Sequence, residues 1–394
     1  MNKNIFVFSF CLLFLCGAIS CRKGTEKLPD SGQPEISGWA KEVGLYKNET
    51  PEQLYEKAKK EGKVVIYSIA GRMRNVKDSF EKQYPGVTLE VYNLPTNEVL
   101  EKISREYDSG IRTADVIHIK DQDHSLYLDY VQKGKLHNYK PADIIKHIDP
   151  KYCRYAMPFF MELTEWFYND EAYPDGPPIS SWWDLTKPEW KGRILLINPL
   201  DNHSHMCIYA GIVLDADAFA DDYKRVFGED ITLHGTQNAG YEFLKRFMEN
   251  DPVFISSNAE LAEAVGIRGQ EHPPLAFAAS SRMRDRKDKG YALQVVSQIT
   301  PNTGLAGLNT LYIVNEAPHP AGAKLLIRWL MGEADGQGPG FYPFNTIGGW
   351  PLRDDVTPVD PIPLSEINIP DIDRTDIYYK LREVSDFWLS IQQK

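Results

Sequence analysis

The sequence lacks the local motifs that mark several common classes of exported protein. It has no Gly-x-Ser-x-Gly nucleophile elbow and no His-Glu-x-x-His zinc motif, and its carboxylates form no recognisable acid/base pair. Positive charge is also scarce, because 44 Lys and Arg face 55 Asp and Glu, which gives a net charge of −11. A protein that tracks nucleic-acid phosphates needs a basic surface. We therefore expect a protein that is not an enzyme, has no nucleic-acid partner and carries any basic patch only locally.

Long apolar runs are missing too, since the longest such stretch, residues 5–15, is too short to span a bilayer. With Lys3 before it and small residues after it, this stretch predicts a signal peptide over residues 1–20. The following "AISC" resembles a bacterial lipobox, although Ala18 stands where a leucine is more usual, and a lipobox would make Cys21 a lipidated residue that anchors the chain to a membrane. The alternative is a simple secretory signal followed by an incidental cysteine. Either interpretation predicts an exported protein, and the first a cell-envelope lipoprotein.

Only five cysteines are present, and none forms a Cys-x-x-Cys pair. Cys11 and Cys16 lie in the expected signal peptide, which leaves Cys153 and Cys207 beyond Cys21. Each is expected to be a small core residue. A disulfide between them is open to an exported protein, and the sequence does not decide it. We expect no cofactor, no metal site and no catalytic residue.

The chain is too long for one ordinary core, so its 394 residues predict two lobes. A polar stretch rich in Gly, Pro and Ser predicts a flexible tether over residues 21–45. The first lobe is expected over residues 46–157 and about 300–356, and the second over 158–299, with a helical segment over 357–394. No repeat of roughly 20 to 50 residues divides the chain in another way.

The first lobe shows a regular alternation of helices and strands. Thr50, Pro51 and Gln53 form a capping box that begins a helix, and Gly62 ends it. The strand "KVVIYS" follows, then a helix from about Met73, the strand "VTLEVYNL", a helix from about Asn97, and the strand "ADVIHIK". Such a β-α-β-α-β series predicts a mostly parallel sheet flanked by helices. The extended aromatic segment 157–170 then leads to a second α/β series that begins at "GRILLINP".

An ordered series of segments resembles the solute-binding proteins of bacterial ABC importers. The segments are "EGKVVIYS", "TADVIHIKD", "WWDLTKPEWKGRILLINP", "NTGLAGLNTLYIV", "HPAGAKLLIRWLMG" and "GGWPLRDDV", and the resemblance covers about residues 51–356. It is to the subgroup of ferric-iron, thiamine, phosphonate and hexose-phosphate binders. It implies a type II-like periplasmic binding protein, in which two α/β lobes joined by a hinge close on a ligand. The implied protein is a monomer that delivers a solute to an ABC permease and its ATPase subunits.

The resemblance also bears on the ligand. Ferric binders of this group hold the metal with two adjacent tyrosines just after the strand that corresponds to residues 275–279. Here that position holds Ser280 and Ser281, and Lys120 stands where an acidic residue would assist a metal. Neutral hydroxyls beside cations do not suit iron. The one Tyr-Tyr pair, Tyr378 and Tyr379, is expected to be packing in the C-terminal helix.

The stretch "SSRMR" that begins at Ser280 offers hydroxyl, backbone N–H and guanidinium donors, which favour an anionic ligand. A phosphate group suits them, since each of its oxygens accepts several hydrogen bonds. We take Arg284 and Arg286 to be surface charges. A further hypothesis is that Glu162 and Glu165 accept hydrogen bonds from sugar hydroxyls and that Trp166 stacks on a sugar ring. His203 and His205 invite a metal interpretation, but no third ligand with suitable spacing is evident. The candidate ligand-binding residues are Ser68, Gly71, Arg72, Lys120, Glu162, Asn202, His203, Ser204, Ser280, Ser281 and Arg282.

The sequence therefore predicts a solute-binding component of an ABC importer that takes a small anionic solute, with a sugar phosphate or a phosphonate as examples. Within the same family the alternative is a ferric-iron or other metal binder. From other classes, an exported hydrolase or a surface lipoprotein stays open.

Overall fold

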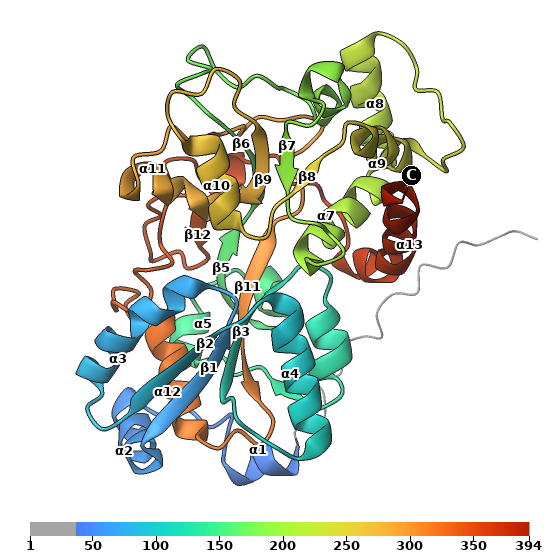
Figure 1. Ribbon diagram of the computed structural model, residues 1–394. Coiled ribbons are helices and arrows are strands. Elements are labelled where there is room, and N and C mark those ends of the chain that lie inside the picture. The colour runs from blue at the N-terminus through green and yellow to red at the C-terminus, as the bar shows by residue number, and fades with distance from the viewer. Residues whose placement is uncertain (1–36, 394) are drawn as a thin grey trace, which may run out of the picture. The chain divides into compact units, whose positions relative to one another are not determined.

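The computed structural model describes residues 37–393, in which two mixed β-sheets with helices around them form two lobes (Figure 1). The expected signal peptide, Cys21 and most of the tether lie outside the described residues. The expected tether is wrong for its last part, because α1 (Gly38–Glu42) forms there. Ala40 and Leu45 are buried in the core of the first lobe. These apolar side chains fix a segment whose polar neighbours suggested a linker.

The first lobe is built on a seven-stranded sheet in the order β12-β5-β11-β3-β1-β2, with β4 also paired to β11. In the described residues, β1 pairs in parallel with β2 and β3, whereas β11 runs antiparallel to each of its three partners. The strands are β1 (Lys63–Ser68), β2 (Thr88–Asn93), β3 (Val116–Asp121), β4 (Leu136–His137), β5 (Met157–Glu162), β11 (Gly307–Val314) and β12 (Gly349–Pro351).

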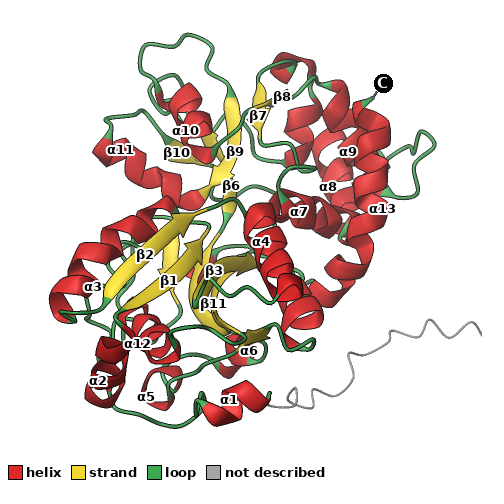
Figure 2. Ribbon diagram, turned by 60° about the horizontal axis from the view of Figure 1, so that its bottom comes forward, coloured by secondary structure: helices red, strands yellow, loops and turns green. Residues whose placement is uncertain are grey.

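Helices surround this sheet, as both views show (Figure 2). The capping box of α2 is present as predicted, with Thr50 and Gln53 bonded reciprocally, and Gly62 ends the helix in the left-handed conformation. The second predicted helix begins as a 3-10 turn over Gly71–Val76 before it becomes α-helical. The helices of this lobe are α2 (Pro51–Glu61), α3 (Lys77–Gln83), α4 (Thr96–Ser109), α5 (Ala142–Ile145), α6 (Pro150–Cys153) and α12 (Pro320–Leu330).

The second lobe has a five-stranded sheet in the order β10-β6-β9-β7-β8. Its strands are β6 (Thr164–Tyr168), β7 (Ile194–Leu196), β8 (Val253–Phe254), β9 (Leu275–Ala279) and β10 (Gln294–Val295). Its helices are α7 (His203–Leu214), α8 (Ala216–Phe227), α9 (Ala239–Glu249), α10 (Asn258–Gly266), α11 (Asp285–Asp288) and α13 (Arg374–Gln392). The C-terminal α13 packs on this lobe, where Trp388 stacks on Tyr209 of α7 at 4.8 Å between ring centroids. The helical segment predicted at the end of the chain is thus part of the second core.

The chain passes between the lobes three times. It leaves the first lobe at Leu163, between β5 and β6, returns before β11, and leaves again after β12 toward α13. We had expected the second lobe to begin at residue 158, but strand pairing keeps β5 in the first sheet as far as Glu162. Both sheets are mixed because the strands beside these passages, β6 and β11, run against their neighbours. Among the described residues, no helix combines the length and apolar character needed to cross a membrane.

Candidate functional site

A cleft of about 540 Å³ is lined by both lobes. The first lobe contributes the chain that follows β1 and β2 together with side chains of β3, β5 and β11, and the second lobe contributes the chain that follows β7, β8 and β9. Ligands of open α/β sheets bind at these carboxyl ends of the strands. The polar residues that line the cleft are Arg72, Asn93, Thr96, Lys120, Glu162, Thr164, Asp201, Asn202, Ser204, His205, Ser256, Ser257, Asn258, Ser281, Arg282, Arg284 and Asn309.

Glu162 lies at the centre of a buried charge network. Its carboxylate oxygens are 3.3 Å from Nη2 of Arg72 and 3.1 Å from Nζ of Lys120. Burial alone would raise the pKa of Glu162, but the two cations and a hydrogen bond from Ser281 lower it to about 2. Glu162 is therefore ionised at neutral pH and holds both cations at the cleft wall.

Arg72 retains hydrogen-bonding capacity beyond Glu162. Its guanidinium lies over the rings of Phe160 and Phe344, at 5.0 and 5.1 Å from the centroids. Its Nη1 is buried and has no hydrogen-bond partner in the protein. Burial lowers the pKa of Arg72 despite the attraction of Glu162, and repulsion by Arg282 lowers it further. An acceptor brought by a ligand would satisfy this nitrogen, since a buried unsatisfied donor is costly.

Three helices begin at the cleft, and each exposes its positive end there. Thr96 begins α4, and Ser204 and His205 lie in the first turn of α7, which Asn202 caps by accepting from the backbone N–H of His205. Ser257 caps α10 in the same way. The unpaired N–H groups and the dipole of a helix N-terminus favour negative charge. The backbone thus supports the same ligand charge as Arg72 and Lys120.

The second-lobe wall beyond β9 is a 3-10 helix over Ser280–Arg284. Ser281 and Arg284 lie one turn apart, and Nη1 of Arg284 donates to the Ser281 hydroxyl at 3.1 Å. Arg282 is 3.3 Å from Asp285, a buried carboxylate behind the wall. These residues place a hydroxyl and two guanidinium groups on the lobe opposite Arg72.

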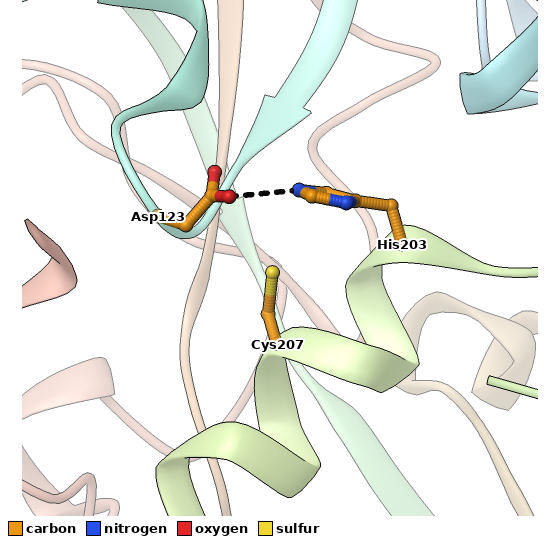
Figure 3. A group of neighbouring side chains, drawn as sticks. All are labelled: Asp123, His203 and Cys207. Atoms are coloured by element: carbon orange, nitrogen blue, oxygen red, sulfur yellow. Dashed lines mark hydrogen bonds and ion pairs between the residues drawn. The ribbon is translucent and has the colours of Figure 1, made fainter. Parts of the chain in front are cut away.

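Eight of the eleven predicted residues line the cleft, namely Gly71, Arg72, Lys120, Glu162, Asn202, Ser204, Ser281 and Arg282. Ser68 and Ser280 do not, because both are fully buried. The Ser68 hydroxyl bonds His118, and that of Ser280 bonds the carbonyl of Gly348 at 2.5 Å. His203 does not line the cleft and hydrogen-bonds to Asp123 (Figure 3). These two serines hold strand ends in place, and His203 belongs to another cluster.

Sequence reasoning missed several polar lining residues. The interpretation of Arg284 as a surface charge is wrong, because Arg284 lines the cleft. The spacing of Ser281 and Arg284 by one 3-10 turn is the signal that places both on the same side. His205 was noticed but not selected, and its Nδ1 is buried without a partner. Asn93, Asn258 and Asn309 carried no signal, because asparagines after strands or before helices are common as caps.

Three further residues considered from the sequence lie outside the cleft. Arg286 pairs with Asp170 away from the cleft, as expected of a surface charge. Trp166, expected to stack on a ligand, is instead buried in the second core against Phe277. Glu165 does not line the cleft. Its pKa is raised to about 8, mainly by burial and in addition by repulsion from Asp360. Cys153 and Cys207 are both free thiols.

The fold and the cleft define a two-lobed ligand-binding protein. The family model described as bacterial extracellular solute-binding protein matches residues 75–365, and the chain belongs to this family. The predicted membership of the solute-binding proteins is therefore confirmed.

Curated relatives and solved structures agree with this membership. The spermidine/putrescine-binding periplasmic proteins of Salmonella typhimurium and Salmonella typhi are 27% identical over 204 residues, which cover 51% of this chain and 52% of each relative. The chain thus spans about half the length of the curated relatives it matches.

Among solved structures, iron-bound HitA from Pseudomonas aeruginosa is similar with a TM-score of 0.64 and 15% identity, covering 84% of this chain and 99% of that one. The periplasmic binding protein AfuA from Actinobacillus pleuropneumoniae, with fructose-6-phosphate bound, has a TM-score of 0.64 and 17% identity over the same shares. At these identities the likeness shows the fold, which is the two-lobed fold that the sequence predicted.

Proposed function

We propose that this protein is the solute-binding component of a bacterial ABC importer and that it captures a small phosphorylated solute between its lobes. The observation that carries the proposal is the buried Nη1 of Arg72, which has no partner and borders a cleft where three helices begin. Ser281, Arg282 and Arg284 add donors from the other lobe. A phosphate group accepts hydrogen bonds on several oxygens and suits such a set of donors.

Two other ligand classes occur among the similar proteins, and the lining residues disfavour both. Iron prefers phenolate and carboxylate oxygens, but none of the residues that line the described cleft is a tyrosine. A polyamine needs carboxylates, and the lining has four cations against Glu162 and Asp201. Since Glu162 is already engaged by Arg72 and Lys120, it offers little to a cationic ligand.

Titration calorimetry with a sugar phosphate, the matching free sugar, a phosphonate and ferric citrate tests the ligand class. We expect the sugar phosphate and the phosphonate to bind, and the free sugar and ferric citrate not to bind. Hydrogen bonds to charged groups contribute roughly 1.5 to 3 kcal/mol each, so Ser281→Ala should weaken binding about tenfold to a hundredfold. Arg282→Ala should cost at least as much, since it removes a charge as well.

Arg286→Ala is the matched control, because this arginine follows the same turn but pairs with Asp170 outside the cleft. It should leave the affinity unchanged. Tight binding of ferric citrate with no binding of any phosphorylated compound would show that the ligand class is wrong. Equal losses in Arg282→Ala and Arg286→Ala would show that the site assignment is wrong.

The proposed location is the cell envelope, with lipid on Cys21 and an ABC permease with its ATPase subunits as partners. Stable retention on a membrane takes more than one acyl chain. The full-length chain should partition into the detergent phase, and Cys21→Ala should move it to the aqueous phase. Aqueous partitioning of the unsubstituted chain would count against the anchor without touching the ligand assignment.

A further inference from the structure

Three ligand-type side chains meet behind the first turn of α7, on the side away from the cleft. They are Asp123, which follows β3 in the first lobe, and His203 and Cys207, which lie four residues apart on α7 (Figure 3). Oδ2 of Asp123 is 3.0 Å from Nε2 of His203, and the donor atoms of all three lie within 4.8 Å of one another. A spacing of four residues places His203 and Cys207 on one face of a helix.

A thiolate, an imidazole and a carboxylate form a ligand set typical of zinc. With bonds of about 2.0 to 2.3 Å, a tetrahedral ion holds its ligand atoms about 3.5 Å apart, so small side-chain movements would close this site. We propose that Asp123, His203 and Cys207 bind a divalent transition-metal ion of the zinc and cobalt type, with a fourth position left for water. No third ligand beside the histidines is evident from the sequence, because Asp123 is distant in the chain and a lone cysteine such as Cys207 is expected in the core.

Burial and access both fit an ion at this place. The side chain of Asp123 is fully buried, and Cys207 is fully buried as well. A buried carboxylate needs compensation, which Asp123 has from His203 at Oδ2 and from the backbone N–H of Ser125 at Oδ1, and a bound ion would add to it. His203 retains 25% side-chain exposure and also borders a cavity of about 240 Å³ formed with Met206 and other residues. This cavity reaches the proposed site at His203, whereas Asp123 and Cys207 do not line it.

The neighbouring charges accommodate a divalent ion. Arg374 of α13 donates to the backbone carbonyl of Asp121 at 3.1 Å, and its charge acts on Asp121, Asp123 and Cys207. Oδ1 of Asp121 is buried without a hydrogen-bond partner. Asp123 and a Cys207 thiolate supply two formal negative charges, which balance a divalent ion. The largest attraction on Arg374 comes from Asp121, which is not one of the three proposed ligands.

The site joins the two lobes, since Asp123 belongs to the first and α7 to the second. The same turn of α7 presents Ser204 and His205 to the cleft on its other side. An ion bound by His203 would fix this turn and thereby the cleft wall. This coupling rests on the proposed function, whereas metal binding itself does not.

Cobalt titration of the full chain tests the site, because tetrahedral cobalt bound to thiolate gives visible bands and a near-ultraviolet charge-transfer band. The parent carries Cys11→Ser, Cys16→Ser and Cys21→Ser, so that the remaining thiols are Cys153 and Cys207. We expect one equivalent of Co²⁺ to produce both sets of bands, and Zn²⁺ to abolish them by displacement. Absence of the charge-transfer band in the folded parent overturns the proposal, whatever the variants do.

Variants then locate the ion. Cys207→Ser should abolish the charge-transfer band, and Asp123→Asn and His203→Gln should each weaken binding at least tenfold. Cys153→Ser is the matched control and should change nothing, as should His147→Ala in the separate group of His147, Asp354 and Asp355. Loss of binding in His147→Ala, or retention in both Asp123→Asn and His203→Gln, overturns the assignment. Circular dichroism checks that each variant folds. If Cys207→Ser does not fold, the cobalt affinities of Asp123→Asn and His203→Gln decide whether the ion binds at this site.

Discussion

Replacing Glu162 by glutamine should destabilise the protein strongly at neutral pH. The substitution keeps the size of the side chain but removes the negative charge between Arg72 and Lys120. The pKa of Glu162 lies near 2 rather than 4.5, and about 2.5 units correspond to about 3.4 kcal/mol of folding free energy. Breaking a buried ion pair by removing one partner costs about 3 to 5 kcal/mol, which agrees. We therefore expect a loss of about 3 to 4 kcal/mol.

The pH dependence follows from the same shift. Because the folded-state pKa is lowered, the stabilisation is fully present above pH 4.5 and is lost as the pH falls from about 4.5 to 2. Urea denaturation followed by tryptophan fluorescence at several pH values measures it. The difference in free energy of unfolding between the parent and Glu162→Gln should fall to zero over this acid range.

Glu165→Gln is a matched control three residues along the chain. The pKa of Glu165 is raised to about 8, so its folding contribution is present below pH 4.5 and is lost as the pH rises toward 8. Above this pH range the ionised carboxylate of Glu165 is buried at a cost in folding free energy, which a neutral amide avoids. Glu165→Gln should therefore be at least as stable as the parent at pH 8. The reasoning is refuted if Glu162→Gln costs less than about 1 kcal/mol at pH 7, or if both variants are destabilised alike.

Three further outcomes are expected. Trp388→Ala should cost about 3 to 5 kcal/mol in urea denaturation, since Trp388 is fully buried against Tyr209; a change below 1 kcal/mol would mean that α13 is not part of the second core. Gly348→Ala should cost about 2 kcal/mol or more, because φ is +75° and a Cβ would lie 2.1 Å from the carbonyl oxygen of Ser280, whereas Gly38→Ala meets nothing within 4 Å and should be neutral. Saturation with a bound sugar phosphate should reduce the radius of gyration in small-angle scattering through hinge closure, and an unchanged radius would contradict closure.

The sequence predicted the fold well where local signals are strong. The capping box at Thr50 fixed the start of α2, and the β-branched run of β1 predicted a buried strand. It did not predict that β11 inserts between β3 and β5, because that pairing joins segments far apart in the chain. Such contacts depend on the packing of whole lobes, which no local pattern reports.

For the site, chain position was a better guide than side-chain direction. Residues in the last part of a strand or just after it line the cleft, as Lys120 in β3, Arg72 after β1 and Ser281 after β9 do. Ser68 and Ser280 follow the same rule in sequence, yet their hydroxyls turn inward to His118 and to Gly348. Successive residues of a strand face opposite sides, so an error of one residue exchanges a ligand contact for a structural one.

The position of β11 has a consequence for the order in which this protein is made. The strand lies between β3 and β5 and pairs with both, but it is encoded after the whole second sheet. During synthesis from the N-terminus, β3 and β5 emerge without the strand that joins them, and their inner edges stay unpaired. The first sheet is completed only when Gly307–Val314 and then Gly349–Pro351, which pairs with β5, have left the ribosome. A growing chain of this design therefore holds an incomplete first sheet throughout the synthesis of its second sheet.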